Sequence, residues 1–417
     1  MKLLLVTLYF PPAGGGGVQR PLKFASHLPA LGIETHVLAP DVPAVAYHDS
    51  ELALPTQAWV HRVRYVGPKG DKPADRLRGT QGLERLGTRA ALLGRRLLVP
   101  DENVPWSTAA MPAAFRIIRQ EEIDVVLTTS PPGSLHLLGA AVQGATGVKW
   151  VADLRDSLTA NPHRRGQESR LVRLKETTAG GVAKLVAARA DAIVAAADAI
   201  ADEVRALEPK GQVATIANGC DFDDFAGLER QPSERLRITH TGSFFGKRDP
   251  KPFLQALAES GLEDVVVRFV GEFRSEDEAF AESLGLRDRI ELPGYVSRRR
   301  SLELQRDSEA LLLLIPEAGG RGRGVLSGKV FEYLAAERPI LAAVPPDGAA
   351  AQLVRDTGAG VVAPPDDVPA LRAALVDLHA RWREDGLEGT ALEPDWRDRL
   401  SRGRRAEELA DLLRSLE

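Results

Sequence analysis

The chain has 417 residues, of which 44% are hydrophobic, and this is more core than one domain usually needs. The formal net charge of -4 argues against an extended surface for nucleic acid, which normally requires a basic protein. The single cysteine, Cys220, excludes a disulfide framework and a CxxC metal site. No stretch approaches the roughly 20 apolar residues that span a bilayer, so we expect a cytoplasmic protein of two domains.

Short apolar or β-branched runs alternate with segments of helical periodicity along almost the whole chain. This alternation predicts parallel sheets covered by helices. In the first half, the predicted strands are Lys2–Leu8, Ile33–Ala39, Val60–Val66, Ile123–Thr128, Lys149–Asp153, Asp191–Ala195 and Gln212–Ala217. In the second half, they are Leu236–Thr241, Val265–Val270, Arg289–Leu292, Ala310–Ile315, Pro339–Val344 and Gly360–Val362.

A segment rich in Asp, Gly and Pro, Asn218–Glu234, separates the two sets of strands and is the candidate linker. We therefore predict an N-terminal domain over residues 1–220 and a C-terminal domain over residues 235–395. The last segment, Trp396–Leu416, has the pattern of a charged amphipathic helix. This helix, over about residues 396–417, could cover either domain. We expect it to pack back on the N-terminal domain.

The first glycine-rich loop follows the first predicted strand. Four glycines come after Pro11-Pro12-Ala13, and a helix begins around Val18. Backbone without Cβ atoms lets a ligand approach closely, and a helix N-terminus attracts phosphate. The loop matches neither a dinucleotide fingerprint nor a Walker motif, so a flexible turn is the alternative. Because the loop opens an α/β domain, we favour a ligand-binding role.

A stronger signal is the segment 321–336, which follows the predicted strand Ala310–Ile315. Its glycine-rich start leads into a helix at the carboxyl edge of the sheet, where open α/β sheets bind ligands. Lys329 and Glu332 are three residues apart and share one face of this helix. A lysine in the first turn suits a phosphate, and a carboxylate one turn further can accept both hydroxyls of a ribose. The alternative is an ordinary surface ion pair between the two residues. For a lysine and a glutamate at this spacing, considered alone, such an ion pair is more common than a binding site.

A third loop follows the predicted strand Leu236–Thr241 and begins with Gly242 and Ser243. It ends on two adjacent cations, Lys247 and Arg248, which are well placed for a diphosphate. An exposed Lys-Arg pair without any role is the common alternative.

Together these segments resemble the family-four-type retaining glycosyltransferases of the GT-B fold, in a branch common in bacterial polysaccharide and natural-product glycosylation. The matching segments, in chain order, are Phe10-Pro11-Pro12 with Val18-Gln19-Arg20, Asp153-Leu154-Arg155-Asp156, Asn218-Gly219-Cys220-Asp221 with Phe225, Thr241-Gly242-Ser243 with Lys247, Phe269-Val270-Gly271, Pro293-Gly294-Tyr295-Val296 and Lys329-Val330-Phe331-Glu332-Tyr333-Leu334-Ala335. Their order covers most of the chain and is specific, although each segment is weak alone. The resemblance implies two Rossmann-like domains facing across a cleft.

By this resemblance, the chain moves a sugar from a nucleoside-diphosphate sugar to an acceptor hydroxyl, with retention and without a metal or other cofactor. Lys329 and Glu332 hold the diphosphate and the ribose, and Asp156 or Arg155 lies at the reaction centre. The donor-binding residues that it implies are Gly15, Gly16, Gly17, Gly242, Ser243, Lys247, Arg248, Gly271, Tyr295, Val296, Gly324, Val325, Leu326, Ser327 and Gly328. The acceptor is a small molecule, a glycan or a lipid-linked group, and the donor base and sugar stay open.

The chain departs from the family pattern at three positions. Gly324 stands where the first glutamate of a Glu-x7-Glu pair is usual, Ser243 where a cation often follows Gly242, and Arg155 where a histidine is usual. These departures concern contacts to the donor sugar rather than to the nucleotide. They leave open a nucleotide-sugar epimerase of the same fold and a non-catalytic nucleotide-sugar-binding partner subunit. A nicotinamide-dependent oxidoreductase is weakened by the missing dinucleotide fingerprint.

Two further patterns carry weaker signals. The triplet Asp221-Phe222-Asp223 is typical of metal-dependent transferases of another fold, but acidic residues are expected at the start of a linker, so no metal site is predicted. Two basic amphipathic stretches, Arg85–Val99 and Arg164–Lys175, would suit peripheral contact with the inner face of an anionic membrane. A solvated helix face is the favoured interpretation of each stretch.

Overall fold

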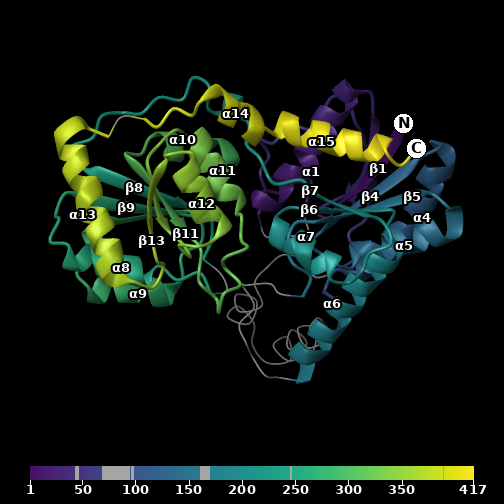
Figure 1. Ribbon diagram of the computed structural model, residues 1–417, viewed down its shortest axis with the longest axis horizontal. Coiled ribbons are helices and arrows are strands. Elements are labelled where there is room, and N and C mark those ends of the chain that lie inside the picture. Colours follow the sequence, from purple (N-terminus) through teal and green to yellow (C-terminus); the bar gives the residue numbers. More distant parts are fainter. Residues whose placement is uncertain (43–46, 68–93, 95–97, 160–169, 245–246, 388) are drawn as a thin grey trace, which may run out of the picture. The chain divides into compact units, whose positions relative to one another are not determined.

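The computed structural model describes residues 1–42, 47–67, 94, 98–159, 170–244, 247–387 and 389–417. Two compact units make up the chain, each built on its own sheet (Figure 1). Unit 1 takes up the chain as far as Ala217 and includes Ala406–Glu417, so both chain ends belong to it. Unit 2 comprises Asn218–Arg405.

The sheet of unit 1 has seven parallel strands in the order β3-β2-β1-β4-β5-β6-β7. The strands are β1 (Lys2–Val6), β2 (Glu34–Pro40), β3 (Trp59–Val63), β4 (Val125–Ser130), β5 (Lys149–Leu154), β6 (Ala192–Ala195) and β7 (Gln212–Thr215). Its α-helices are α1 (Gln19–His27), α4 (Val104–Gln120), α5 (Leu135–Thr146), α6 (Arg170–Arg189) and α7 (Asp198–Arg205), together with most of α15 (Arg402–Arg414).

Apolar side chains fill both faces of this sheet. Leu3 and Leu5 of β1 point into a core closed by α1 and α15, whereas Leu4 and Val6 point into a core closed by α4 and α5. Because side chains alternate between the faces of a strand, a sheet covered on both sides needs continuous apolar runs. The uninterrupted run at the start of the sequence is therefore a buried strand.

The sheet of unit 2 has six parallel strands in the order β10-β9-β8-β11-β12-β13. The strands are β8 (Leu236–Thr241), β9 (Val265–Val270), β10 (Ile290–Gly294), β11 (Ala310–Leu314), β12 (Ile340–Ala343) and β13 (Gly360–Ala363). The α-helices are α8 (Lys251–Glu259), α9 (Ser275–Ser283), α10 (Arg298–Arg306), α11 (Gly328–Ala335), α12 (Ala349–Asp356), α13 (Val368–Asp385) and α14 (Pro394–Leu400). Helices α8 and α13 lie side by side over one face (Figure 1).

The strand order determines where each unit can bind a ligand. Every strand predicted from the sequence overlaps an observed one, and the predicted parallel α/β architecture is confirmed. In both sheets the winding direction reverses between the first and fourth strands, β1 and β4 in unit 1 and β8 and β11 in unit 2. Open α/β sheets bind ligands at the carboxyl ends of the strands at this switch point.

One helix prediction is wrong in detail. The segment Trp396–Leu416, predicted as one helix, forms the end of α14 and α15, with Ser401 between them in an extended conformation. The backbone around Ser401 pairs with Cys220, and the Ser401 Oγ accepts a hydrogen bond from the Arg404 N–H. A serine that caps a helix in this way marks the start of a new helix.

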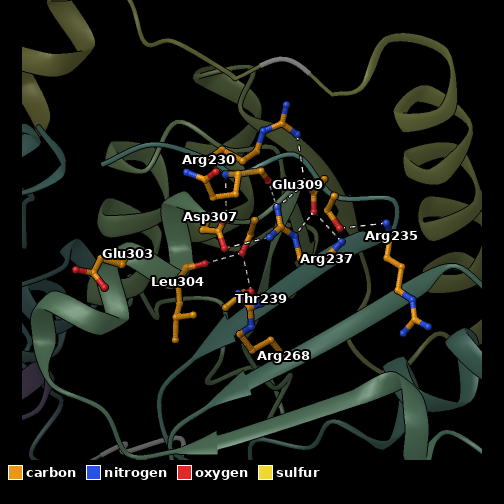
Figure 2. Close-up of polar contacts among 12 residues, drawn as sticks. Arg230, Arg235, Arg237, Thr239, Arg268, Glu303, Leu304, Asp307 and Glu309 are labelled. Carbon is orange, nitrogen blue, oxygen red and sulfur yellow. Dashed lines mark hydrogen bonds and ion pairs between the residues drawn. The ribbon is translucent and has the colours of Figure 1, made fainter. Parts of the chain in front are cut away.

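The amino edge of the unit 2 sheet carries a buried ion network, shown in Figure 2. The carboxylate of Glu309, at the start of β11, is fully buried and accepts hydrogen bonds from Arg237 at 2.9 Å. Arg230 adds an ion pair at 3.3 Å, and Arg237 also binds Asp307 at 3.0 Å. This network ties the segment before β8 to the segment before β11, at the edge opposite the switch point.

Both basic stretches named above fall largely outside the described residues. Residues 85–99 are described only at Gly94 and from Leu98, and residues 164–175 only from Arg170, where α6 begins. Near the start of α6, Arg173 and Leu174 are exposed. No helix in the described part of the chain is long and apolar enough to cross a bilayer.

Candidate functional site

Two glycines shape the switch point of unit 2. Gly242 follows β8 with φ +108°, and Gly271 follows β9 with φ +125°, a region of φ that residues with a side chain disfavour. A Cβ atom on Gly271 would lie 2.8 Å from the backbone nitrogen of Ser243, so the two loops pack backbone against backbone. The N–H of Gly271 in turn donates to the carbonyl of Gly294 at 2.8 Å. The loops after β8, β9 and β10 therefore adjoin one another.

Lys329 reaches into this junction from the first turn of α11. Ser327 caps the helix, and its Oγ accepts from the Lys329 N–H at 3.4 Å. A Cβ atom on Gly242 would lie 2.7 Å from the Lys329 Nζ, so the ammonium group rests directly on the glycine turn. The predicted helix, its cap and the glycine turn thus meet at the carboxyl ends of β8 and β11 (Figure 1).

The electrostatics of this junction favour an anion. Burial, and after it the charge of Arg248, lower the pKa of Lys329 to about 7, although Glu332 opposes the shift. Arg248 is 5% exposed and donates to the Ser243 carbonyl at 3.0 Å, and its pKa is lowered to about 10, mainly by burial. Two cations held near each other in a low-dielectric setting are stabilised by an incoming phosphate. Lys247, the neighbouring candidate, has an exposed side chain.

A buried polar layer, for which the sequence analysis predicted no role, supports these residues. The Tyr333 Oη accepts from the Thr241 N–H at 2.8 Å, and burial raises the pKa of Tyr333 to about 12. The His240 Nδ1 lies 2.8 Å from the Leu312 carbonyl, and burial, with Lys329 and Arg248, holds the pKa of His240 well below its usual value. His240 is therefore neutral and leaves the positive charge to the two cations above it.

Glu332 lies one turn further along α11 and pairs with an arginine from another helix. Its Oε1 accepts from the Arg298 guanidinium at 2.8 Å. Burial alone would raise the pKa of Glu332, but Arg298 and Arg402 outweigh it and hold the pKa below the usual value. The glutamate is therefore an ionised acceptor at neutral pH.

The remaining predicted donor residues of unit 2 lie on the segment that follows β10 and on the one that leads into α11. Tyr295 and Val296 follow Gly294 at the end of β10, and Tyr295 is 37% exposed. The loop from Gly324 to Gly328 is half-buried to exposed and leads into α11. Before it, Arg323 pairs with Glu317 at 3.4 Å and with Asp347 at 3.2 Å, which anchors the loop away from its glycines.

In unit 1, Arg155 joins the loops at the switch point. It follows β5, donates to the carbonyl of Gly17, and donates to the Ser130 carbonyl at 2.8 Å. Its guanidinium also lies 5.6 Å from the centre of the Tyr9 ring. The predicted residues Arg155 and Gly17 are thus brought together, and the side chain of Asp156 beside them is exposed. Gly15, with φ +90°, leads into the helical turn that starts at Gly16.

A buried ion pair under these loops was not predicted as part of a site. Arg20 of α1 donates to Asp153 of β5 at 2.8 Å, and both side chains are almost fully buried. Thr129 also donates to Asp153, at 2.7 Å. Both residues belong to the matching segments in the sequence, but their pairing joins positions 133 residues apart, which no local pattern reveals.

Two acidic residues at the start of the linker, one of them in the triplet, pair with arginines. Asp221 pairs with Arg402 at 3.1 Å, and Asp224, the next acidic residue after the triplet, pairs with Arg298 at 2.9 Å. Among the described residues, no group of three or more His, Cys, Asp or Glu side chains is arranged to hold a metal ion.

Solved structures similar to this chain share its fold over their whole length. The sucrose-phosphate synthase of Thermosynechococcus elongatus aligns with a TM-score of 0.66 and 17% identity, over 100% of this chain and 98% of that one. HepE of Anabaena, solved in complex with UDP-glucose, aligns with a TM-score of 0.64 and 14% identity, over 100% of both chains. A putative UDP-N-acetylglucosamine 2-epimerase of Listeria monocytogenes aligns with a TM-score of 0.54 and 12% identity, over 99% and 96%. The fold is therefore GT-B.

Family models match both halves of the sequence. No curated protein sequence matches the chain. The model described as Glycosyl transferases group 1 matches residues 235–381. The model described as Glycosyltransferase Family 4 matches residues 14–224, which is more than half of the 417 residues. The chain therefore belongs to glycosyltransferase family 4.

Proposed function

We propose that this glycosyltransferase moves a sugar from a nucleoside-diphosphate sugar to an acceptor hydroxyl, with retention of configuration and without a metal ion. The position of Lys329 is the observation that supports this proposal most strongly. The Lys329 ammonium rests on the turn at Gly242 with Arg248 nearby, at the switch point of a parallel sheet. A diphosphate is the ligand that such a pair of cations and a helix N-terminus would bind best.

In the proposed reaction the diphosphate is the leaving group. The bond between the anomeric carbon and the phosphate oxygen breaks, and a bond from that carbon to the acceptor oxygen forms on the same face. The hydroxyl proton passes to the departing phosphate. Lys329, Arg248 and the start of α11 neutralise the charge that develops there.

The other donor contacts follow from the placement of the loops. We assign the ribose to Glu332, the base to Tyr295 and Val296, and the sugar to the backbone of the loop from Gly324 to Gly328. The presence of UDP-glucose on HepE, a protein of the same fold, makes UDP sugars the first donors to test.

We assign the acceptor to unit 1, with Asp156 near the reacting hydroxyl and the turn Gly15–Gly17 facing the diphosphate. Arg155, whose donors bind backbone carbonyls, would hold this turn in shape. The acceptor would be a small molecule, a glycan or a lipid-linked hydroxyl. The proposal places the reaction in the cytoplasm, with membrane contact that is at most peripheral.

The substitution Lys329→Ala tests the proposal. Because the ammonium would bind charge that grows in the transition state, we expect kcat to fall by about 10²- to 10³-fold. The melting temperature should not decrease, since a buried cation is removed. The nucleotide of the donor is first identified by a thermal-shift screen of the wild-type protein with UDP, GDP, ADP and dTDP. A ligand that binds the folded state raises the melting temperature. Wild-type turnover in the variant would contradict the assignment.

A second candidate function is an epimerase that acts on the free donor. The likeness in fold to the putative epimerase, over nearly the whole chain, favours keeping it. Incubation of the donor without an acceptor separates the two functions, because only an epimerase would release an isomerised nucleotide sugar. A non-catalytic binding subunit, suggested by Gly324 in place of a glutamate, would bind nucleotide but neither transfer nor hydrolyse the donor.

A further inference from the structure

An arginine without an assigned role bridges two carboxylates beside the candidate donor site. The Arg298 guanidinium donates to Glu332 Oε1 at 2.8 Å and to Asp224 Oδ2 at 2.9 Å. The side chains of Arg298 and Glu332 are each 16% exposed, and that of Asp224 is 24% exposed. These ion pairs are thus half-buried, where geometry is better defined and solvent screening weaker than at the surface.

The three residues come from three separate elements. Arg298 is the first residue of α10, Asp224 belongs to a short helical turn at 222–225, and Glu332 is in α11. Ser297 caps α10, and its side chain accepts from the Arg300 N–H, which fixes the backbone at Arg298. A planar guanidinium presents its N–H groups in several fixed directions, so that it can bind two carboxylates on different elements at once.

The ion pairs of Arg298 favour the charged forms of Arg298 and Glu332. Burial alone would lower the pKa of Arg298, but Glu332 and Asp224 raise it above its ordinary value. Asp221, close in sequence to Asp224, has its own partner in Arg402 at 3.1 Å. Arg298 is therefore committed to Glu332 on one side and Asp224 on the other.

The second oxygen of Glu332 is held less tightly. Gln305 Nε2 lies 3.5 Å from Oε2, at the limit of a hydrogen bond, whereas Arg298 lies 2.8 Å from Oε1. A carboxylate has about four lone-pair positions for donors. Arg298 on Oε1 and Gln305 beside Oε2 together restrict the rotation of the carboxylate, and acceptor capacity remains for hydroxyl donors.

We propose that Arg298 is a positioning residue of the donor site, which orients the Glu332 carboxylate so that it accepts both ribose hydroxyls of the donor nucleotide. The inference rests on the proposed function, since Glu332 must contact the ribose. Asp224 acts behind Arg298 and limits the positions that its side chain can take. Arg298 itself touches no part of the donor.

The test compares each nucleoside diphosphate that binds, UDP first, with its 2′,3′-dideoxy analogue in the Arg298→Gln variant. Hydrogen bonds to a charged group make the wild-type protein bind the ribose form about 10- to 100-fold more tightly than the dideoxy form. In Arg298→Gln this ratio falls to about threefold or less, while affinity for the dideoxy form stays within about twofold. The ratio within one variant is independent of any general loss of stability.

Three further variants sharpen the result. Arg298→Lys, which keeps the charge but loses the planar arrangement of donors, recovers only part of the ratio. Asp224→Asn lowers the ratio less than Arg298→Gln does. Arg299→Gln is the matched control, because the neighbouring arginine is exposed and pairs only at the surface with Glu303, and it leaves the ratio unchanged.

The outcomes separate the inference from the proposed function. If Arg298→Gln weakens both ligands equally and keeps the wild-type ratio, Arg298 has only a structural role and the inference is overturned. If wild-type protein binds no nucleoside diphosphate, or Glu332→Gln leaves the ratio unchanged, the proposed role of Glu332 fails and the inference fails with it.

Discussion

At the scale of single residues, the role proposed for Lys329 predicts that donor binding is coupled to proton uptake. Its neighbours are Arg248, Glu332 and the neutral His240, and its pKa is lowered to about 7 by burial and by Arg248. A bound diphosphate would raise this pKa again, because it brings negative charge to the ammonium group. Above pH 7 the free site is therefore largely unprotonated, and binding must take up a proton.

This linkage predicts the sign of two pH effects. Nucleotide affinity falls as the pH rises above about 7, by up to tenfold per pH unit, until the pKa of the bound form is reached. Between about pH 7 and the pKa of an unfolded lysine, about 10.4, the native state binds fewer protons than the unfolded state, so Lys329 makes stability rise with pH.

Calorimetry in buffers of different ionisation enthalpy measures this effect. At pH 8 we expect wild-type protein to take up about one proton per nucleotide bound, and Lys329→Met to take up none. Lys184, exposed on α6 of unit 1, provides the matched control as Lys184→Met. Equal proton uptake in the wild type and in Lys329→Met would show that Lys329 does not titrate on binding.

The residues that sequence reasoning missed share one physical property. Arg298 begins a run of three arginines that is indistinguishable from a solvated helix face, and its role depends on Glu332, 34 residues away. In the sequence, His240 is one residue of an apolar strand. Its neutral state follows from burial and from the charges of Lys329 and Arg248, which the sequence does not place beside it. Contacts between distant segments leave no local pattern, whereas a glycine before a helix does.

At the scale of elements, one edge of the unit 2 sheet carries residues proposed for binding, and the other edge carries residues that stabilise the unit. The carboxyl edge carries the candidate donor site, and the amino edge carries the network around Glu309 (Figure 2). The six residues of β8 place the two edges about 20 Å apart. Substitutions at the amino edge should therefore change stability with little effect on binding.

The variant Glu309→Gln tests this separation. It replaces the fully buried carboxylate that pairs with Arg237 and Arg230 by a neutral amide. The free energy of unfolding of unit 2 should fall by about 3 kcal/mol. Glu282→Gln, which breaks an exposed pair with Arg287, should cost less than about 1 kcal/mol. Hydrogen exchange of the β8 and β11 amides gives the two values. Nucleotide affinity should stay unchanged in both, and equal stability of the two variants would refute the role of the network.

The elements themselves were predicted well for a simple reason. Strands buried on both faces are short continuous apolar runs, and loops with glycine follow them, so the pattern locates all the observed strands. The break at Ser401 was missed because amphipathic periodicity continues through it, while the pairing with Cys220 comes from a segment 181 residues earlier. Helix periodicity shows which face is apolar but not where the chain turns.

At the scale of the whole molecule, the end of the chain completes unit 1. Leu409 and Leu413 of α15 are fully buried in the core that also contains Leu3 and Leu5 of β1. A leucine truncated to alanine in such a core leaves a cavity. The last helix therefore contributes to a core that begins at the other end of the sequence.

We predict that Leu413→Ala lowers the stability of unit 1 by about 2–5 kcal/mol. Hydrogen exchange should show faster exchange of the amides of β1 and β2, with the strands of unit 2 unchanged. Asp411→Ala, which breaks an exposed pair with Arg414, is the control and should change little. If exchange accelerates equally in both units, or in neither, the packing assigned to α15 does not govern unit 1.

The identity of the fold could be predicted from the sequence, because the order of strands and glycine-rich loops is read directly from the chain. The chemistry of the donor sugar could not, since Gly324 removes the side chain that the family pattern would supply. In the proposed function the backbone of the loop from Gly324 to Gly328 would make the contact, and backbone contacts depend on conformation rather than on residue type.

A crystal structure with a bound nucleoside diphosphate tests the central claim most directly. We predict that the diphosphate oxygens lie within hydrogen-bonding distance of Lys329 Nζ and the Arg248 guanidinium, above the turn at Gly242. The claim is contradicted if the nucleotide occupies another part of the molecule while the Lys329 ammonium still rests on Gly242.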